Sequence, residues 1–162
     1  MRLLRNIKNR LIRMRHRKGH GVHSPYIYNI VREVFMSRGS DGSSGELFER
    51  LTALGSNRKC ALELQNLFTH CGYKSFSIDS FDPKSMADII VCSKDFSQGD
   101  TLNAIDQAAS SGSTIVLLRG ASDSFREHLN HDIIAKHSST SVDKRGYLLI
   151  FNNHLPKQHF IL

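Results

Sequence analysis

The run Met86-Ala87-Asp88-Ile89-Ile90-Val91-Cys92 decides the fold class of this 162-residue chain. It is short, apolar and rich in β-branched side chains, which is typical of a strand buried on both faces of a parallel sheet. Ser113-Thr114-Ile115-Val116-Leu117-Leu118 has the same character. We expect a helix between them, over residues 100–110, with three inward-facing residues: Leu102, Ile105 and Ala109. The segment therefore predicts one strand–helix–strand unit of a parallel sheet.

Further elements flank this unit on both sides. Residues 73–78 alternate as a strand does and end at Asp79, and a helix is expected from Ser122 to about Lys136. The tail contains three more strand patterns, at residues 139–142, 146–151 and 158–162. No helix fits between the last two, so we expect them to pair antiparallel at a sheet edge. The predicted fold is α/β: a Rossmann-like, mostly parallel sheet with an antiparallel C-terminal strand pair, preceded by N-terminal helices.

The first of those helices is signalled by Ser24-Pro25. Ser24 can accept a hydrogen bond from a first-turn amide, and Pro25 fits the first helical position because no N–H is needed there. Four apolar residues then recur at helical spacing: Ile27, Ile30, Val31 and Val34. Two further helices are expected over residues 46–54 and 57–71, each closed by a glycine.

We expect residues 1–18 to be a basic amphipathic helical arm, followed by a hinge and the capped helix (19–38), a flexible Gly/Ser-rich linker (39–45) and the Rossmann-like sheet domain (46–162). The arm has no acid and eight basic residues: Arg2, Arg5, Lys8, Arg10, Arg13, Arg15, Arg17 and Lys18. The rest of the chain has fourteen basic and fifteen acidic residues, so the net charge of +7 belongs to the arm. Leu, Ile and Met recur in the arm every three or four residues. Either the arm contacts an anionic membrane surface or nucleic acid phosphates, or it packs its apolar stripe on the body.

The three cysteines, Cys60, Cys71 and Cys92, are odd in number and contain no Cys-x-x-Cys pair. This pattern argues against a disulfide framework and a zinc knuckle, and favours buried thiols in a reducing compartment. No apolar run reaches the length of a membrane span, and the N-terminus lacks the continuous apolar region of a secretory signal. We therefore expect a cytoplasmic protein, with peripheral attachment to the inner membrane surface as one role for the arm.

The motif His20-Gly21-Val22-His23-Ser24-Pro25-Tyr26 resembles the His-Gly-(Val/Ile)-His-Ser-Pro-Phe opening of a bacterial group of S-adenosylmethionine-dependent methyltransferase-like proteins, common in Bacteroidetes. The tail, residues 146–151 and 156–162, is similar to the closing strands of that group. Asp88–Val91 and Thr114–Leu117 stand where the group has its fourth and fifth strands. The resemblance covers both ends and most of residues 73–162.

The resemblance implies an S-adenosylmethionine cofactor and places Asp79 where an acidic residue holds the ribose hydroxyls. A lone Asp after a strand also serves as a helix cap or turn former. For His20 and His23 three roles remain open: anchors that bind loop backbone, an acid/base or substrate-positioning pair in the cofactor cleft, or metal ligands. A metal would need further ligands, and only scattered histidines are present, so no metal is expected.

Three departures from the group's pattern concern the cofactor. The group has a glycine-rich turn after its first strand, where backbone approaches the ligand closely. Here Cys60–Leu64 is either a relic of that strand or part of a helix, and Gln65-Asn66-Leu67 stands where glycines are expected. Ser93 replaces an acid after the fourth strand, and Arg119-Gly120 replaces acids after the fifth.

Two hypotheses follow. In the first, which we favour, the protein is a shortened member with a degraded S-adenosylmethionine site. It would then be a non-catalytic binding or scaffold module that works through its arm or through self-association. In the second it is an active S-adenosylmethionine-dependent methyltransferase on an unknown small-molecule substrate, with Asp79 on the ribose and His20 and His23 near the substrate.

Overall fold

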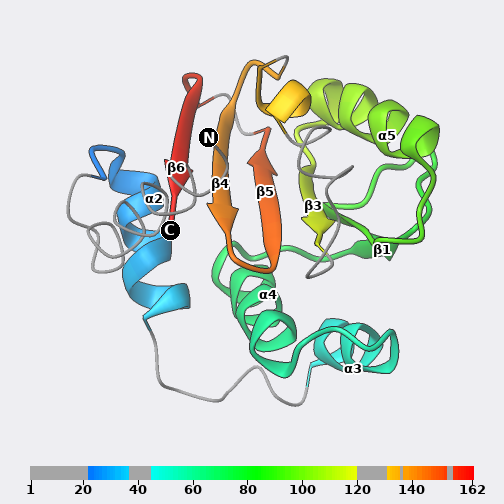
Figure 1. Cartoon of the computed structure of the whole chain (residues 1–162), viewed down its shortest axis with the longest axis horizontal. Helices are drawn as coiled ribbons and strands as arrows, with labels where there is room; N and C mark the ends of the chain where they lie inside the picture. Colours follow the sequence, from blue (N-terminus) through cyan, green and yellow to red (C-terminus); the bar gives the residue numbers. More distant parts are fainter. Residues whose placement is uncertain (1–21, 37–44, 120–130, 136, 153–154) are drawn as a thin grey trace, which may run out of the picture. The chain divides into compact units, whose positions relative to one another are not determined.

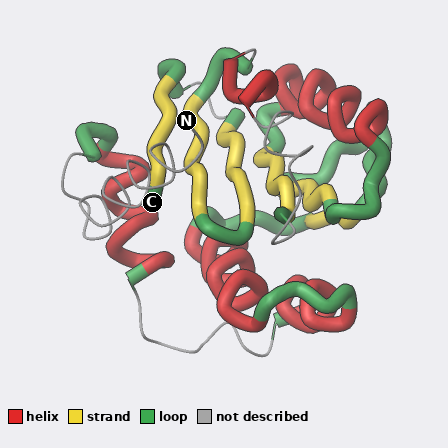
Figure 2. Tube along the Cα trace, viewed as in Figure 1, coloured by secondary structure: helices red, strands yellow, loops and turns green. Residues whose placement is uncertain are grey.

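The computed structural model describes residues 22–36, 45–119, 131–135, 137–152 and 155–162. The chain divides into two compact units, Met1–Gly72 with Ile161–Leu162, and Tyr73–Phe160. In the traces of Figures 1 and 2, the described part of the first unit is mainly helical, and the second contains the body of the sheet. The basic arm, His20, residues 39–44 of the predicted linker and most of the helix predicted from Ser122 to about Lys136 lie outside the described residues.

Helix α2 (Pro25–Ile30) begins where Ser24-Pro25 predicts. The Ile27 amide donates to Ser24 Oγ at 3.4 Å, and Pro25 occupies the first turn. The chain continues as a π-helical turn, η1 (Val31–Phe35), in which the Met36 amide donates to the Val31 carbonyl at 2.9 Å. The four apolar residues of the predicted stripe are all buried.

Helices α3 (Glu46–Ala53) and α4 (Arg58–His70) follow, and they pack against each other within the first unit. Gly55 and Gly72, which follow them, have positive φ angles of 76° and 67°, as helix-ending glycines do. The helical prediction for residues 57–71 is therefore confirmed, and Cys60–Leu64 is not a strand.

The sheet has six strands in the order β1-β2-β3-β5-β4-β6. Their bounds are β1 (Phe76–Ile78), β2 (Ile89–Cys92), β3 (Thr114–Leu118), β4 (Thr140–Lys144), β5 (Tyr147–Phe151) and β6 (Gln158–Ile161). Strands β1, β2 and β3 pair in parallel, whereas β5 is antiparallel to both β3 and β4. This confirms the predicted α/β class, with a mostly parallel sheet and an antiparallel pair in its C-terminal part.

The partners within that pair differ from our expectation. Strand β5 pairs with β4 instead of β6, and β6 lies beyond β4 at the edge. Only Arg145 and Gly146 separate β4 from β5, so these two strands form a tight hairpin. The other edge of β5 is occupied by β3, which leaves β4 as the neighbour available to β6.

Helix α5 (Gln98–Ser111) covers one face of the sheet (Figure 1). Ser97 caps its first turn by accepting from the Asp100 amide at 3.1 Å. Ala104, Ile105 and Ala108 enter the core with alternate residues of the strands: Ile90, Cys92, Ile115, Leu117, Leu148 and Ile150. The inward position expected for Ala109 is wrong, because Ala104 and Ala108 share the buried stripe and Ala109 lies one residue beyond it, exposed.

Candidate functional site

The candidate site lies at the carboxyl edge of the sheet. Strands β1, β2 and β3 are parallel, so the residues that follow them, Asp79, Ser93 and Arg119, come to the same edge. Two antiparallel steps turn β4 into the same direction, which brings Asp143 there as well. Ligands of open α/β sheets bind at the carboxyl ends of the strands, so this edge is where a cofactor would be expected.

Asp79 is bound by the neighbouring strand end. Its carboxylate accepts hydrogen bonds from the Ser93 amide and from Ser93 Oγ, each at 2.6 Å. Its own amide donates to the Val91 carbonyl at 2.9 Å, and its φ angle of 51° lies in the left-handed region. Each carboxylate oxygen thus has a donor from Ser93, so Asp79 joins the end of β1 to the end of β2.

A second carboxylate joins β1 and β2 at their opposite ends. Asp88 Oδ2 accepts from the amides of Lys74 and Ser75 at 2.7 and 3.0 Å and from Ser75 Oγ at 3.2 Å. The Lys74 amide, followed by the Ser75 donors, holds the pKa of Asp88 below its ordinary value, although partial burial acts in the other direction. The short strand β1 is therefore tied to β2 at both ends.

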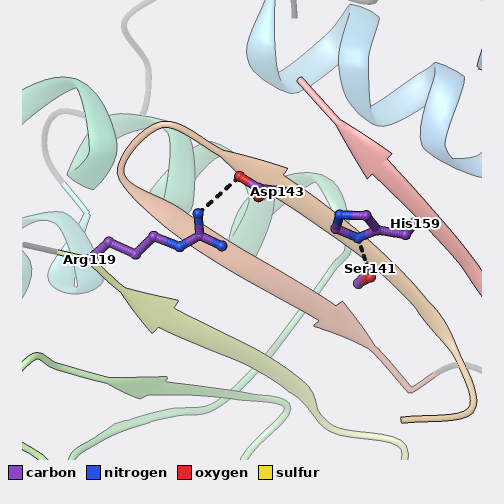
Figure 3. A network of polar contacts seen from close by, with 4 residues as sticks. All are labelled: Arg119, Ser141, Asp143 and His159. Carbon is purple, nitrogen blue, oxygen red and sulfur yellow. Dashed lines mark hydrogen bonds and ion pairs between the residues drawn. The ribbon is translucent and has the colours of Figure 1, made fainter. Parts of the chain in front are cut away.

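Arg119 is bound across the sheet. Arg119 Nη1 and Asp143 Oδ1 form an ion pair at 3.1 Å, and the two side chains are 18% and 15% exposed. Because β5 lies between β3 and β4, the guanidinium spans the start of β5 to reach Asp143 (Figure 3). The Arg119 amide also donates to the Gly146 carbonyl at 2.9 Å. Nε and Nη2 of Arg119 are buried and have no acceptor among the described residues.

Ser141 and His159 form a third tie, between β4 and β6. Ser141 Oγ and His159 Nδ1 are 2.8 Å apart, on the same side of the sheet as Asp143 (Figure 3). A Ser–His contact is the geometry of an activated nucleophile, but Ser141 is fully buried, so its hydroxyl cannot reach a substrate. We interpret the pair as a cross-strand hydrogen bond, which the sequence pattern did not reveal.

The residues that replace the glycine turn have a structural role in the first unit. Gly45, which precedes α3, has no side chain to cap that helix, and the Phe48 amide instead donates to Gln65 Oε1 of α4 at 3.1 Å. A Cβ on Gly45 would lie 2.1 Å from Gln65 Cδ. The Gln65 side chain on α4 thus caps the first turn of α3. Gly45 leaves space for the side-chain amide of Gln65, because it has no Cβ.

Gln65→Ala should lower the free energy of unfolding by about 1 kcal/mol, because it leaves the buried Phe48 amide without an acceptor. Gly45→Ala should be destabilising in the natural chain but close to neutral in the Gln65→Ala background, where the clash is absent. Urea unfolding of the four proteins measures this coupling, and Asn66→Ala on the same helix is the control. Equal effects of Gly45→Ala in both backgrounds would contradict the capping role.

The remaining predicted site residues belong to the first unit or fall outside the described chain. His23 is exposed in the first unit, whereas Asp79 belongs to the second. His20 and the eight basic residues of the arm are not among the described residues. Cys60 and Cys92 are buried thiols as expected, whereas Cys71 is partly exposed, with Sγ 3.7 Å from the Tyr26 hydroxyl.

Within the described ranges, no group of three or more His, Cys, Asp or Glu side chains is placed to hold a metal ion. No helix in the same ranges has both the length and the apolar character required to cross a bilayer. Comparisons with protein-family models, curated proteins and solved structures find no match to this chain.

Proposed function

We propose that the protein is a methyltransferase-like binding or scaffold module whose carboxyl sheet edge holds strands together instead of holding S-adenosylmethionine. One observation carries the proposal: Asp79 and Arg119, the polar residues that follow β1 and β3, are each bound to another strand end of the same sheet. The two hydrogen bonds from Ser93, each at 2.6 Å, occupy about half of the acceptor sites of the Asp79 carboxylate and hold it against the end of β2, which gives this side chain a structural role.

The region expected to carry the cofactor turn also supports this proposal. Residues 58–70 form α4 instead of a strand and a glycine turn, and Gln65 caps α3. In the described residues, β1 is the edge strand, and no strand lies on its outer side to create the crevice in which such ligands bind. The residues present therefore do not fit S-adenosylmethionine, and we assign no methyl-transfer step to them.

The binding element in this proposal is the arm, residues 1–18. It has eight positive charges, whereas the rest of the chain is nearly neutral. Its apolar residues recur at helical spacing: Leu3, Leu4, Ile7, Leu11 and Met14. An anionic membrane can bind both features of the arm, because its headgroups attract the basic residues and its acyl region buries the apolar stripe. Nucleic acid phosphates bind only the basic residues. The combination therefore favours a membrane surface. We place the protein in the cytoplasm, with the arm on an anionic membrane surface.

Vesicle co-sedimentation tests this function. We expect the full chain to bind vesicles that contain phosphatidylserine and not to bind vesicles of pure phosphatidylcholine. The bound protein should dissociate when the salt concentration exceeds about 0.5 M. A chain without residues 1–18 should keep its circular dichroism spectrum and lose binding. Leu4→Ser with Leu11→Ser keeps every charge and should weaken vesicle binding. If the full chain does not bind vesicles at low salt, or binds them equally with and without these leucines, the membrane assignment is wrong.

A further inference from the structure

The junction that leads into β4 contains a buried histidine in a defined tautomer. His137 is 9% exposed, and its amide donates to the Ile133 carbonyl at 3.0 Å. The Ser139 amide donates to His137 Nδ1 at 3.3 Å. A nitrogen that accepts a hydrogen bond has its lone pair there, so the ring is neutral with its proton on Nε2. Nε2 is buried and has no acceptor among the described residues.

The residues that lead into β6 are attached at the same junction. Lys157 Nζ donates to the Ala135 carbonyl at 2.6 Å, next to the helical turn 131–135. Thr140 Oγ1 donates to the Pro156 carbonyl at 2.9 Å, and Ser141 contacts His159 on β6. These three attachments of residues 156–159 all come from residues 135–141, the segment that contains His137.

Burial and nearby charged groups both disfavour protonation of the ring. Burial is the largest cause that lowers the pKa of His137 below the ordinary 6.5, and Lys157 and His159 lower it further. Both of these residues come from the segment that includes β6. Two hydrogen bonds attach His137 to its neighbours in the chain: its amide donates to the Ile133 carbonyl of the helical turn, and its ring accepts from the amide of Ser139, the residue before β4.

We propose that this junction is a proton-sensitive clasp for the C-terminal strand, which holds β6 on β4 while His137 is neutral and releases β6 when His137 is protonated. Protonation places a hydrogen on Nδ1, so two donors, Nδ1–H and the Ser139 amide, would point at each other. It also adds a positive charge beside Lys157, the residue that anchors the start of β6. Both effects act on the same attachment.

The pH range of the clasp follows from the sign of the linkage. The folded state holds the His137 proton more weakly than the unfolded chain, so acidification favours opening. The stabilisation is complete above the unfolded value of 6.5 and is lost as pH falls below it towards the lower folded pKa. The clasp is therefore closed at neutral pH and opens in mildly acidic conditions.

Amide hydrogen exchange of the full chain at about pH 7.5 and about pH 5 tests the clasp, with rates corrected for intrinsic pH dependence. We expect the protection of residues 156–162 to fall about tenfold at the lower pH while that of β2 is retained. His137→Asn places an amide oxygen near the position of Nδ1 and does not titrate, so its β6 protection should not depend on pH. His131→Asn, at an exposed histidine on the same helical turn, should behave as the natural chain does.

A second variant tests the proposal independently if His137→Asn folds poorly. Lys157→Gln removes a positive charge that opposes the protonation of His137, so the titration of the His137 ring, followed by NMR, should move to a higher pH. Because the folded pKa then lies closer to the unfolded value, the loss of β6 protection between about pH 7.5 and about pH 5 should be smaller than in the natural chain. Protection of β6 that is independent of pH in the natural chain, or that is lost equally in His137→Asn, would overturn the proposal. So would a pH-dependent loss of protection that Lys157→Gln leaves unchanged.

Discussion

Asp143→Ala is expected to lower the free energy of unfolding by about 3 kcal/mol, because it leaves a largely buried guanidinium without its partner. Arg119 is only 18% exposed, and its Nε and Nη2 are buried without an acceptor in the described chain, so water cannot readily replace the carboxylate. Urea unfolding monitored by circular dichroism measures the loss. Asp106→Ala, at an exposed carboxylate on α5, is the control and should change stability by less than about 0.5 kcal/mol.

A double-mutant cycle separates the pair from its parts. Arg119→Met removes the charge but keeps much of the side-chain volume, so the combination with Asp143→Ala should cost less than the two single changes added together. The coupling should be about 1–3 kcal/mol. If the two changes are additive, the contact between β3 and β4 contributes nothing to the sheet, and the structural role of this edge is wrong.

Asp79→Ala is expected to cost a similar amount, about 3 kcal/mol, for two reasons. It removes the acceptor of both Ser93 hydrogen bonds, and it puts an alanine at a φ angle of 51°. Asp79→Asn tolerates this backbone and keeps one acceptor, so it should cost only about 1 kcal/mol. Asp79→Gly relieves the backbone but removes the acceptor, and should fall between the two. Thermal or urea unfolding gives the order.

The matched change on the other strand is Ser93→Ala, which removes one of the two donors. Its effect should largely disappear in the Asp79→Ala background, because the hydrogen bond that it breaks is already absent. If Asp79→Ala proves as stable as the natural chain, Asp79 has no part in holding β1 to β2, and its carboxylate is available for another role.

The sequence was sufficient to predict the parts of the fold that depend on local patterns. The apolar runs around Ile90 and Val116 predicted two buried parallel strands, and Ser24-Pro25 predicted the start of α2. The glycine after residue 71 correctly ended α4. Each of these signals lies within a few residues of the feature that it predicts, because capping, hydrophobic periodicity and left-handed turns are local.

The contacts that define the candidate site could not be predicted in this way, because each joins residues far apart in the chain. Asp79 and Ser93 are fourteen positions apart in the chain, and Arg119 and Asp143 are twenty-four positions apart. The opposite charges of Arg119 and Asp143 could have indicated their ion pair. This inference needs the order of the strands, which shows that both residues lie at the same end of the sheet. The same lack of order information led us to pair β6 with β5, although β3 and β4 fill both edges of β5.

Calorimetric titration can distinguish an Asp79 that serves the sheet, as we propose, from an Asp79 that binds a cofactor. Full-length protein is titrated with S-adenosylmethionine and with its demethylated product, beside the folded variant Asp79→Asn. We expect no binding heat for either protein at ligand concentrations up to about 1 mM. Micromolar binding by the natural chain that is lost in Asp79→Asn would contradict this expectation and would make this edge a working cofactor site.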